Sequence, residues 1–191
     1  DGSRLGAIAV PKRRPRRVVG PDGTAATMRG TTVVLRKDER SLVLRHRDRV
    51  NSIAFSPSGQ LLATASRDRD ARIWNVATGE LVRVFPHNTA VRDAQFSPDG
   101  RWLVTAALRA SLWDANDGTN LVRLKGHEGI LTAATFDASG RNIVTGGADG
   151  TVRTYRCELC GDVDRLMALA EARLAATGRE LTLEERELYL G

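Results

Sequence analysis

Residues 46–86 read HRDRVNSIAFSPSGQLLATASRDRDARIWNVATGELVRVFP, and this stretch decides the fold. Its apolar runs last about five residues each, and turn signals containing Gly, Pro, Asp or Ser separate them. The pattern predicts four short strands, over 50–55, 61–66, 71–75 and 81–85, in one antiparallel meander. A turn glycine such as Gly59 suits a tight hairpin because glycine adopts positive φ without penalty.

The same pattern returns with a period of 40 to 41 residues. In each unit a histidine is followed by a phenylalanine, a turn glycine and an aromatic residue. The members in this order are His46, Phe55, Gly59 and Trp74; His87, Phe96, Gly100 and Trp113; and His127, Phe136, Gly140 and Tyr155. A residue that recurs once per unit usually holds that unit together. The recurrence therefore argues against a catalytic role for the histidines.

The repeated motifs resemble the WD-repeat family. The resemblance is carried by the recurring histidine, the Ser-Pro-Asp-Gly turn at 97–100, the Leu-Ala-Thr-Ala-Ser strand at 62–66 and Arg-Ile-Trp-Asn at 72–75. It implies an all-β fold of WD40-type β-propeller blades arranged around a channel.

The resemblance also implies a hydrogen-bonded chain of histidine, serine or threonine, aspartate and tryptophan inside each blade. In the first full unit these residues are His46, Ser66, Asp68 and Trp74. The second unit keeps His87 and Trp113 but is two residues shorter at its second turn and has no aspartate. The third keeps His127 and Asp149, with Gly147 at the serine position and Tyr155 at the tryptophan position.

The repeat divides the chain into about four blade-like units and two terminal segments. We expect a partial strand and basic linker at 1–16, a degenerate blade at 17–45, WD blades at 46–86 and 87–126, a last blade without its fourth strand at 127–156, and a helical tail at 157–191. The helical spacing of apolar residues from Val163 to Leu174 supports the tail. Propellers close with about four to eight blades. We therefore expect a partial propeller from a longer chain, prone to self-association through open edges.

Positive charge is concentrated near the N-terminus. Residues 1–50 carry 13 Lys or Arg against 5 Asp or Glu, whereas residues 51–191 carry 16 against 18. The centre of this charge is a run that comprises Lys12, Arg13, Arg14, Arg16 and Arg17. Such a run is a candidate polyanion site. Without interleaved aromatic residues, a solvated linker is the simpler interpretation.

Cys157 and Cys160 have the spacing of half a metal or redox site. A structural zinc needs four ligands, and the sequence contains no second pair. We therefore expect two small residues that pack between the last blade and the tail, with a disulfide or a shared metal site as the alternatives. Two cysteines in 191 residues favour a reducing compartment, and we expect a cytoplasmic protein without a cofactor.

The sequence contains no phosphate-binding loop, nucleophile elbow or zinc-protease helix. We therefore expect a non-catalytic protein-interaction scaffold or sensor, with a protein or an upstream effector domain as partner. The tail resembles the ends of large bacterial WD-repeat signalling or defence proteins. A nucleic-acid-associated module and a fragment of a propeller enzyme are the alternatives. Candidate partner-binding residues on the histidine loops and second turns are Arg47, Arg49, Arg67, Arg69, Arg92 and Arg109.

Overall fold

The computed structural model describes residues 17–157 and residue 160. The expected N-terminal segment at 1–16 lies outside the described residues, and so does the expected helical tail beyond residue 160. The fold below therefore concerns the repeat region.

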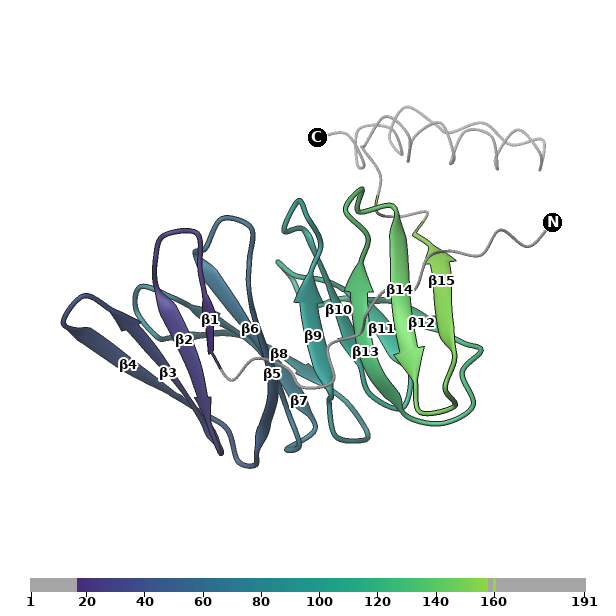
Figure 1. Ribbon diagram of the computed structural model, residues 1–191, viewed down its shortest axis with the longest axis horizontal. Coiled ribbons are helices and arrows are strands. Elements are labelled where there is room, and N and C mark those ends of the chain that lie inside the picture. Colours follow the sequence, from purple (N-terminus) through teal and green to yellow (C-terminus); the bar gives the residue numbers. More distant parts are fainter. Residues whose placement is uncertain (1–16, 158–159, 161–191) are drawn as a thin grey trace, which may run out of the picture.

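The described residues form four antiparallel sheets, each a meander of consecutive strands (Figure 1). The first sheet contains β1 (Arg17–Val19), β2 (Ala25–Arg29), β3 (Thr32–Lys37) and β4 (Arg40–Arg45). The second contains β5 (Val50–Phe55), β6 (Leu61–Ser66), β7 (Asp70–Asn75) and β8 (Leu81–Pro86). The third contains β9 (Asp93–Phe96), β10 (Trp102–Ala106), β11 (Ala110–Asp114) and β12 (Asn120–Leu124). The fourth contains β13 (Leu131–Phe136), β14 (Asn142–Gly147) and β15 (Val152–Arg156).

The expectation of an all-β chain of repeated meanders is confirmed. Within the second sheet, β5 and β6 have the predicted bounds, while β7 begins one residue early and β8 ends one residue late. The last paired residues before the second turn are Ala65 and Ala71 in the second sheet but Ala106 and Ala110 in the third. The turn thus has five residues in the second sheet and three in the third, as the missing residues of the second unit indicate.

Neighbouring sheets lie side by side in chain order, from β1–β4 at one end of the row to β13–β15 at the other (Figure 1). Contacts between β2 and β5, between β5 and β9 and between β9 and β13 join them. The second and third sheets therefore bury their faces against the sheets that precede and follow them, as repeat architectures do.

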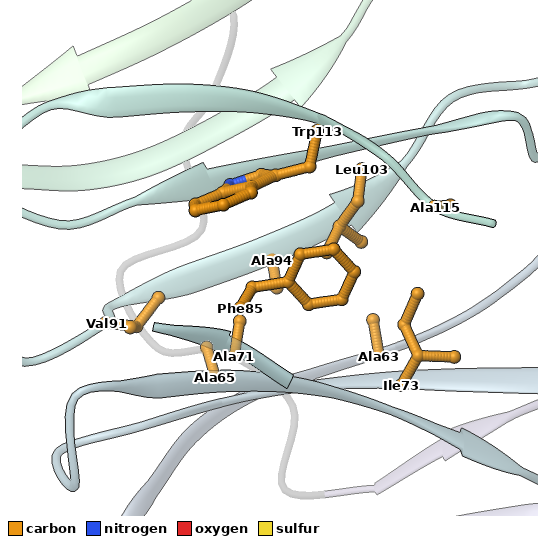
Figure 2. Close-up of a cluster of buried hydrophobic side chains, with 10 residues drawn as sticks. All are labelled: Ala63, Ala65, Ala71, Ile73, Phe85, Val91, Ala94, Leu103, Trp113 and Ala115. Atoms are coloured by element: carbon orange, nitrogen blue, oxygen red, sulfur yellow. The ribbon is translucent and has the colours of Figure 1, made fainter. Parts of the chain in front are cut away.

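The core between the second and third sheets is built around Phe85 (Figure 2). Its side chain on β8 is fully buried. Its ring meets that of Trp113 edge to face, with the centroids 5.4 Å apart. Ile73 from the second sheet and Leu103 from the third complete the contact. A single aromatic side chain thus couples two repeats.

The turn glycines serve both the turn and the contact between sheets. Gly59 has a φ of 74° and Gly100 a φ of 77°, a conformation that glycine adopts without strain. A Cβ on Gly59 would come within 3.1 Å of the Pro21 ring in the preceding sheet. A Cβ on Gly100 would lie 3.4 Å from Pro57 in the same way. The recurring Pro and Gly of the turn signal therefore pack against each other across neighbouring repeats.

Candidate functional site

A chain of buried hydrogen bonds crosses the second sheet. The Trp74 Nε1–H donates to Thr64 Oγ1 at 2.9 Å, and the Thr64 hydroxyl lies 2.7 Å from His46 Nε2. His46 Nδ1 lies 2.9 Å from Asp68 Oδ2. Because indole only donates and a carboxylate only accepts, a neutral imidazole with its proton on Nδ1 satisfies every link. The order is Trp74, Thr64, His46 and Asp68.

The hydroxyl in this chain is that of Thr64, so the prediction that Ser66 fills this position is wrong. Ser66 Oγ instead donates to the main-chain oxygens of Asp48 and Arg49, at 3.0 and 3.2 Å, and accepts the Asp68 N–H. Ser66 therefore joins the histidine loop to the second turn. The repeat contains a signal for the correct residue, because a threonine follows each histidine by 18 residues, as Thr64, Thr105 and Thr145.

The third sheet keeps the tryptophan–threonine–histidine links of this hydrogen-bonded chain. Trp113 Nε1–H donates to Thr105 Oγ1 at 2.8 Å, and that hydroxyl lies 2.9 Å from His87 Nε2. His87 Nδ1 lies 2.9 Å from the main-chain oxygen of Phe85, which replaces the aspartate.

The fourth sheet keeps the threonine–histidine–aspartate links of the hydrogen-bonded chain. His127 lies 2.7 Å from Thr145 Oγ1 and 3.0 Å from Asp149 Oδ2. The Tyr155 hydroxyl donates to the Lys125 main-chain oxygen instead of to the threonine. Tyr155 therefore takes the tryptophan position without its hydrogen bond.

The first sheet replaces the polar chain with apolar contacts. Met28 follows the turn glycine Gly23 by five residues, as Thr64 follows Gly59. Leu35 pairs with Ala26 in the register that places Trp74 opposite Leu62. Met28 and Leu35 belong to one apolar cluster, which matches the degenerate character of this unit.

The electrostatic environment keeps the buried imidazoles neutral. Burial lowers the pKa of His46 below its ordinary value of 6.5, although Asp68 acts to raise it. Burial also lowers the pKa of His87. For Asp68, burial acts to raise the pKa, but hydrogen bonds from the Arg47 N–H and His46 outweigh it and the pKa is lowered.

The lowered pKa values predict a pH dependence of stability. Near and below pH 6.5 the unfolded state binds more protons than the folded state. Above that pH, the neutral imidazoles of His46 and His87 therefore make their full contribution to the stability of the fold. It is lost as the pH falls through the folded-state pKa values. We expect the free energy of unfolding to fall between about pH 7 and about pH 5. An NMR titration of the ring carbons checks the cause, and a His46 midpoint above 6.5 would contradict it.

The candidate arginines lie on loops at one end of the sheets, which we call the histidine face: residues 46–49, 67–69, 87–92 and 107–109. Main-chain bonds from Arg67 N to Arg49 O and from His87 N to Arg69 O connect these loops, each at 2.9 Å. The structure thus brings together the six arginines of the second and third units. Five are exposed, and Arg92 is half-buried.

The neighbouring carboxylates of Asp48, Asp68 and Asp70 bind groups other than the side chains of these arginines. Arg72 binds Asp70 at 2.9 Å and Asp68 at 3.2 Å. Asp48 accepts the Arg49 main-chain N–H. Within the described part of the chain, none of the six arginines forms an ion pair.

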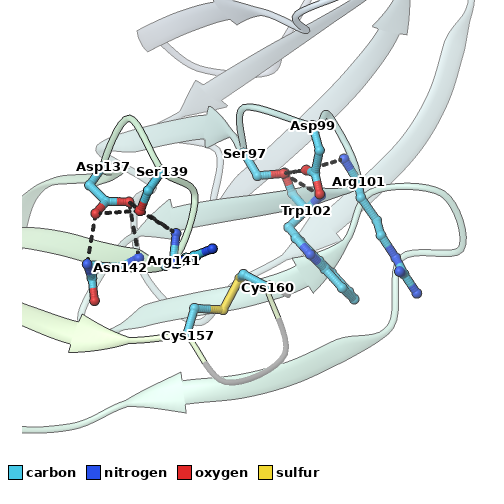
Figure 3. The surroundings of a disulfide bond; sticks show 10 residues. All are labelled: Ser97, Asp99, Arg101, Trp102, Asp137, Ser139, Arg141, Asn142, Cys157 and Cys160. Carbon is cyan, nitrogen blue, oxygen red and sulfur yellow. Dashed lines mark hydrogen bonds between the residues drawn. A yellow bond between two sulfur atoms is a disulfide. The ribbon is translucent and has the colours of Figure 1, made fainter. Parts of the chain in front are cut away.

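The other candidate residues lie apart from this face. Of the basic run, only Arg17 belongs to the described residues, where it begins β1 and lines an open cavity with Arg29 and Arg36. Cys157 and Cys160 are joined by a disulfide, which is one of the alternatives that the sequence left open for this pair (Figure 3). Both still pack against the core of the third and fourth sheets.

The part of the chain that the structure describes contains neither a cluster of metal-ligating side chains nor a helix that could span a membrane. No group of three or more His, Cys, Asp or Glu in residues 17–157 is arranged around a possible metal ion. In the same range, no helical segment has the length and apolar character needed to span a bilayer.

Comparison with known proteins agrees with the repeat seen in the structure. The family model described as WD domain, G-beta repeat matches residues 39–75, 79–116 and 118–156, together more than half of the chain. Translation initiation factor 3 subunit I of Aspergillus terreus is 31% identical over 138 residues, which are 64% of this chain and 41% of that protein. Nuclear distribution protein nudF of Aspergillus flavus is 38% identical over 116 residues, 58% of this chain and 26% of that protein.

Protein HIR1 of Candida albicans is 29% identical over 131 residues, 59% of this chain and 14% of that protein. This chain thus spans less than half the length of these relatives. All three are fungal proteins, so the expectation of a bacterial signalling protein finds no support in them. Three matching repeats and their hydrogen-bonded sheets show that the chain belongs to the WD40 repeat family.

Proposed function

We propose that this chain is a non-catalytic scaffold whose histidine face binds an acidic segment of a protein partner. One observation carries the proposal. Arg47, Arg49, Arg67 and Arg69 are exposed on two loops that hydrogen bonds join, and their side chains form no ion pair within the described residues, because Asp68 and Asp70 are paired with Arg72. Arginine is favoured at binding surfaces because its planar group makes paired bonds to carboxylates.

The backbone of Arg69 supports the same proposal. Arg69 has a φ of 74°, in a region that is unfavourable for a side chain other than glycine. The fourth sheet places Gly150 one residue after its own aspartate, Asp149, with a φ of 76°. A glycine therefore fits this turn without strain. An arginine held there at a cost of about 1 kcal/mol suits a role in binding better than a role in folding.

The relatives support a role in assembly, since the first protein named above is described as a subunit of a translation initiation factor. WD40 repeats are typically protein-interaction modules. We extend the proposal to a sensor or scaffold portion of a larger protein, with the partner either a separate protein or another domain of that protein. Self-association through the outer faces of the first and fourth sheets stays a prediction.

The test reverses the charge of the histidine face. We expect the variant with Arg49→Glu, Arg69→Glu and Arg109→Glu to lose at least about tenfold in affinity for the native partner, because each substitution replaces attraction with repulsion. Pull-down followed by titration calorimetry measures this. The control variant carries Arg101→Glu, Arg141→Glu and Arg156→Glu, which change the same charge at the opposite end of the sheets. Equal affinity of the two variants, both folded, would remove the histidine face from consideration.

A further inference from the structure

The third sheet lacks the one carboxylate that the second and fourth sheets both hold at the histidine face. In the second sheet, Asp68 accepts the main-chain N–H of Arg47 at 3.0 Å. In the fourth, Asp149 accepts the main-chain N–H of Glu128 at 3.0 Å. The corresponding residue in the third sheet is Asn88, one position after its histidine. Its N–H has no acceptor in the described part of the chain.

The shorter turn leaves space where that carboxylate would lie. A cavity of about 140 Å³ opens there, which we call the notch, lined among others by His87, Asn88, Thr89, Leu108, Arg109 and Arg123. One water needs only about 10–15 Å³ of such space. The notch is therefore large enough for a carboxyl group and its adjoining carbon.

The charges around the notch favour an anion. Arg109 and Arg123 are exposed side chains on its wall. Arg123 lines the same cavity as His87, and its charge acts, after burial, to lower the pKa of that imidazole. The carboxylate of Asp70 in the second sheet also acts on His87, but it is bound by Arg72. The His87 Nδ1–H donates its hydrogen bond to Phe85 O and is not directed at the Asn88 N–H.

We propose that the notch binds the carboxylate of an aspartate or glutamate side chain from a protein partner, which takes the place that Asp68 and Asp149 hold in the adjacent sheets. The inference rests on the proposed function and deepens it, since it selects one anchoring point on the histidine face. The carboxylate would accept the Asn88 N–H and paired bonds from arginine, a strong class of hydrogen bond.

A peptide of alternating Gly and Glu is the probe, and its Gly and Gln counterpart is the control. The full chain, labelled with nitrogen-15, is titrated with each peptide. We expect the Asn88 amide resonance to shift in a saturable way with the Glu peptide. The Arg47 and Glu128 amides serve as internal controls, because each already donates to a carboxylate. Equal shifts with both peptides would overturn the proposal.

A pair of grafts tests the notch itself. In the filled graft, a copy of residues 66–70 replaces residues 107–109, which restores the length of the turn and supplies the aspartate in cis. The empty graft is identical except that alanine replaces the copy of Asp68. We expect the filled graft to bind the Glu peptide about tenfold more weakly than the empty graft. Equal affinities would contradict the proposal.

A milder variant covers the case in which the grafts fail to fold. Arg123→Gln should lower the affinity for the Glu peptide by about fivefold or more, whereas Arg141→Gln at the opposite end of the sheets should leave that affinity unchanged. The notch variants could bind the Glu peptide as tightly as the wild type while the charge-reversed variant still loses its native partner. In that case the proposed carboxylate site in the notch is wrong and the proposed function stands. If the charge-reversed face keeps the partner, the proposed function itself fails.

Discussion

Phe85→Ala is expected to destabilise the protein by about 4 kcal/mol, the largest effect of any single substitution that we predict. The Phe85 side chain is fully buried, and its ring packs against Trp113 of the next sheet. Removing it leaves a cavity that the flanking strands of two sheets cannot fill. Denaturant unfolding followed by tryptophan fluorescence and circular dichroism measures the loss.

The neighbouring position supplies the control. Val84 lies on the same strand, but 40% of its surface is exposed. Val84→Ala should change the free energy of unfolding by less than about 1 kcal/mol, because few contacts are lost. Equal destabilisation by both substitutions would show that Phe85 does not couple the second and third sheets.

Thr64→Val is expected to cost about 3 kcal/mol, although the two side chains have nearly the same shape. The substitution leaves the Trp74 indole N–H and His46 Nε2 without their partner in a buried site. Each unpaired buried group costs about 1–3 kcal/mol. Thermal and denaturant unfolding measure the change.

Thr145→Val in the fourth sheet is the matched control. Thr145 is as buried as Thr64, but its hydroxyl bonds to the histidine of its sheet and not to the aromatic residue, because Tyr155 bonds to Lys125. We expect it to cost about half as much as Thr64→Val. If Ser66→Ala proved more harmful than Thr64→Val, the order of the hydrogen-bonded chain given above would be contradicted.

The repeated apolar runs and turn glycines were enough to predict the sheets, because hairpin register follows from strand length and turn type. They were not enough to choose between Thr64 and Ser66. These residues are two apart on β6, so their side chains point to the same face and alternation cannot separate them. The constant spacing of 18 residues from each histidine separates them, since only Thr64 has counterparts in the other units.

Other features of the candidate site depend on the three-dimensional arrangement. The missing aspartate of the third unit is visible in the sequence, but the bond from His87 to Phe85 O that replaces it is not. The positive φ of Arg69 is signalled only by the repeat, because the fourth unit has Gly150 at the matching position after its aspartate. The disulfide of Cys157 and Cys160 depends on the direction of the chain after β15, which spacing alone leaves open.

Hydrogen exchange of the full chain with and without its native partner tests whether the histidine face binds that partner, because it locates the binding surface without any substitution. We expect slower amide exchange in the histidine face, residues 46–49, 67–69, 87–92 and 107–109, when the partner is bound. Residues 56–60, 97–101 and 137–141, at the opposite end of the sheets, should exchange as in the free protein. Slower exchange at that opposite end, with unchanged exchange in the histidine face, would contradict partner binding at the histidine face.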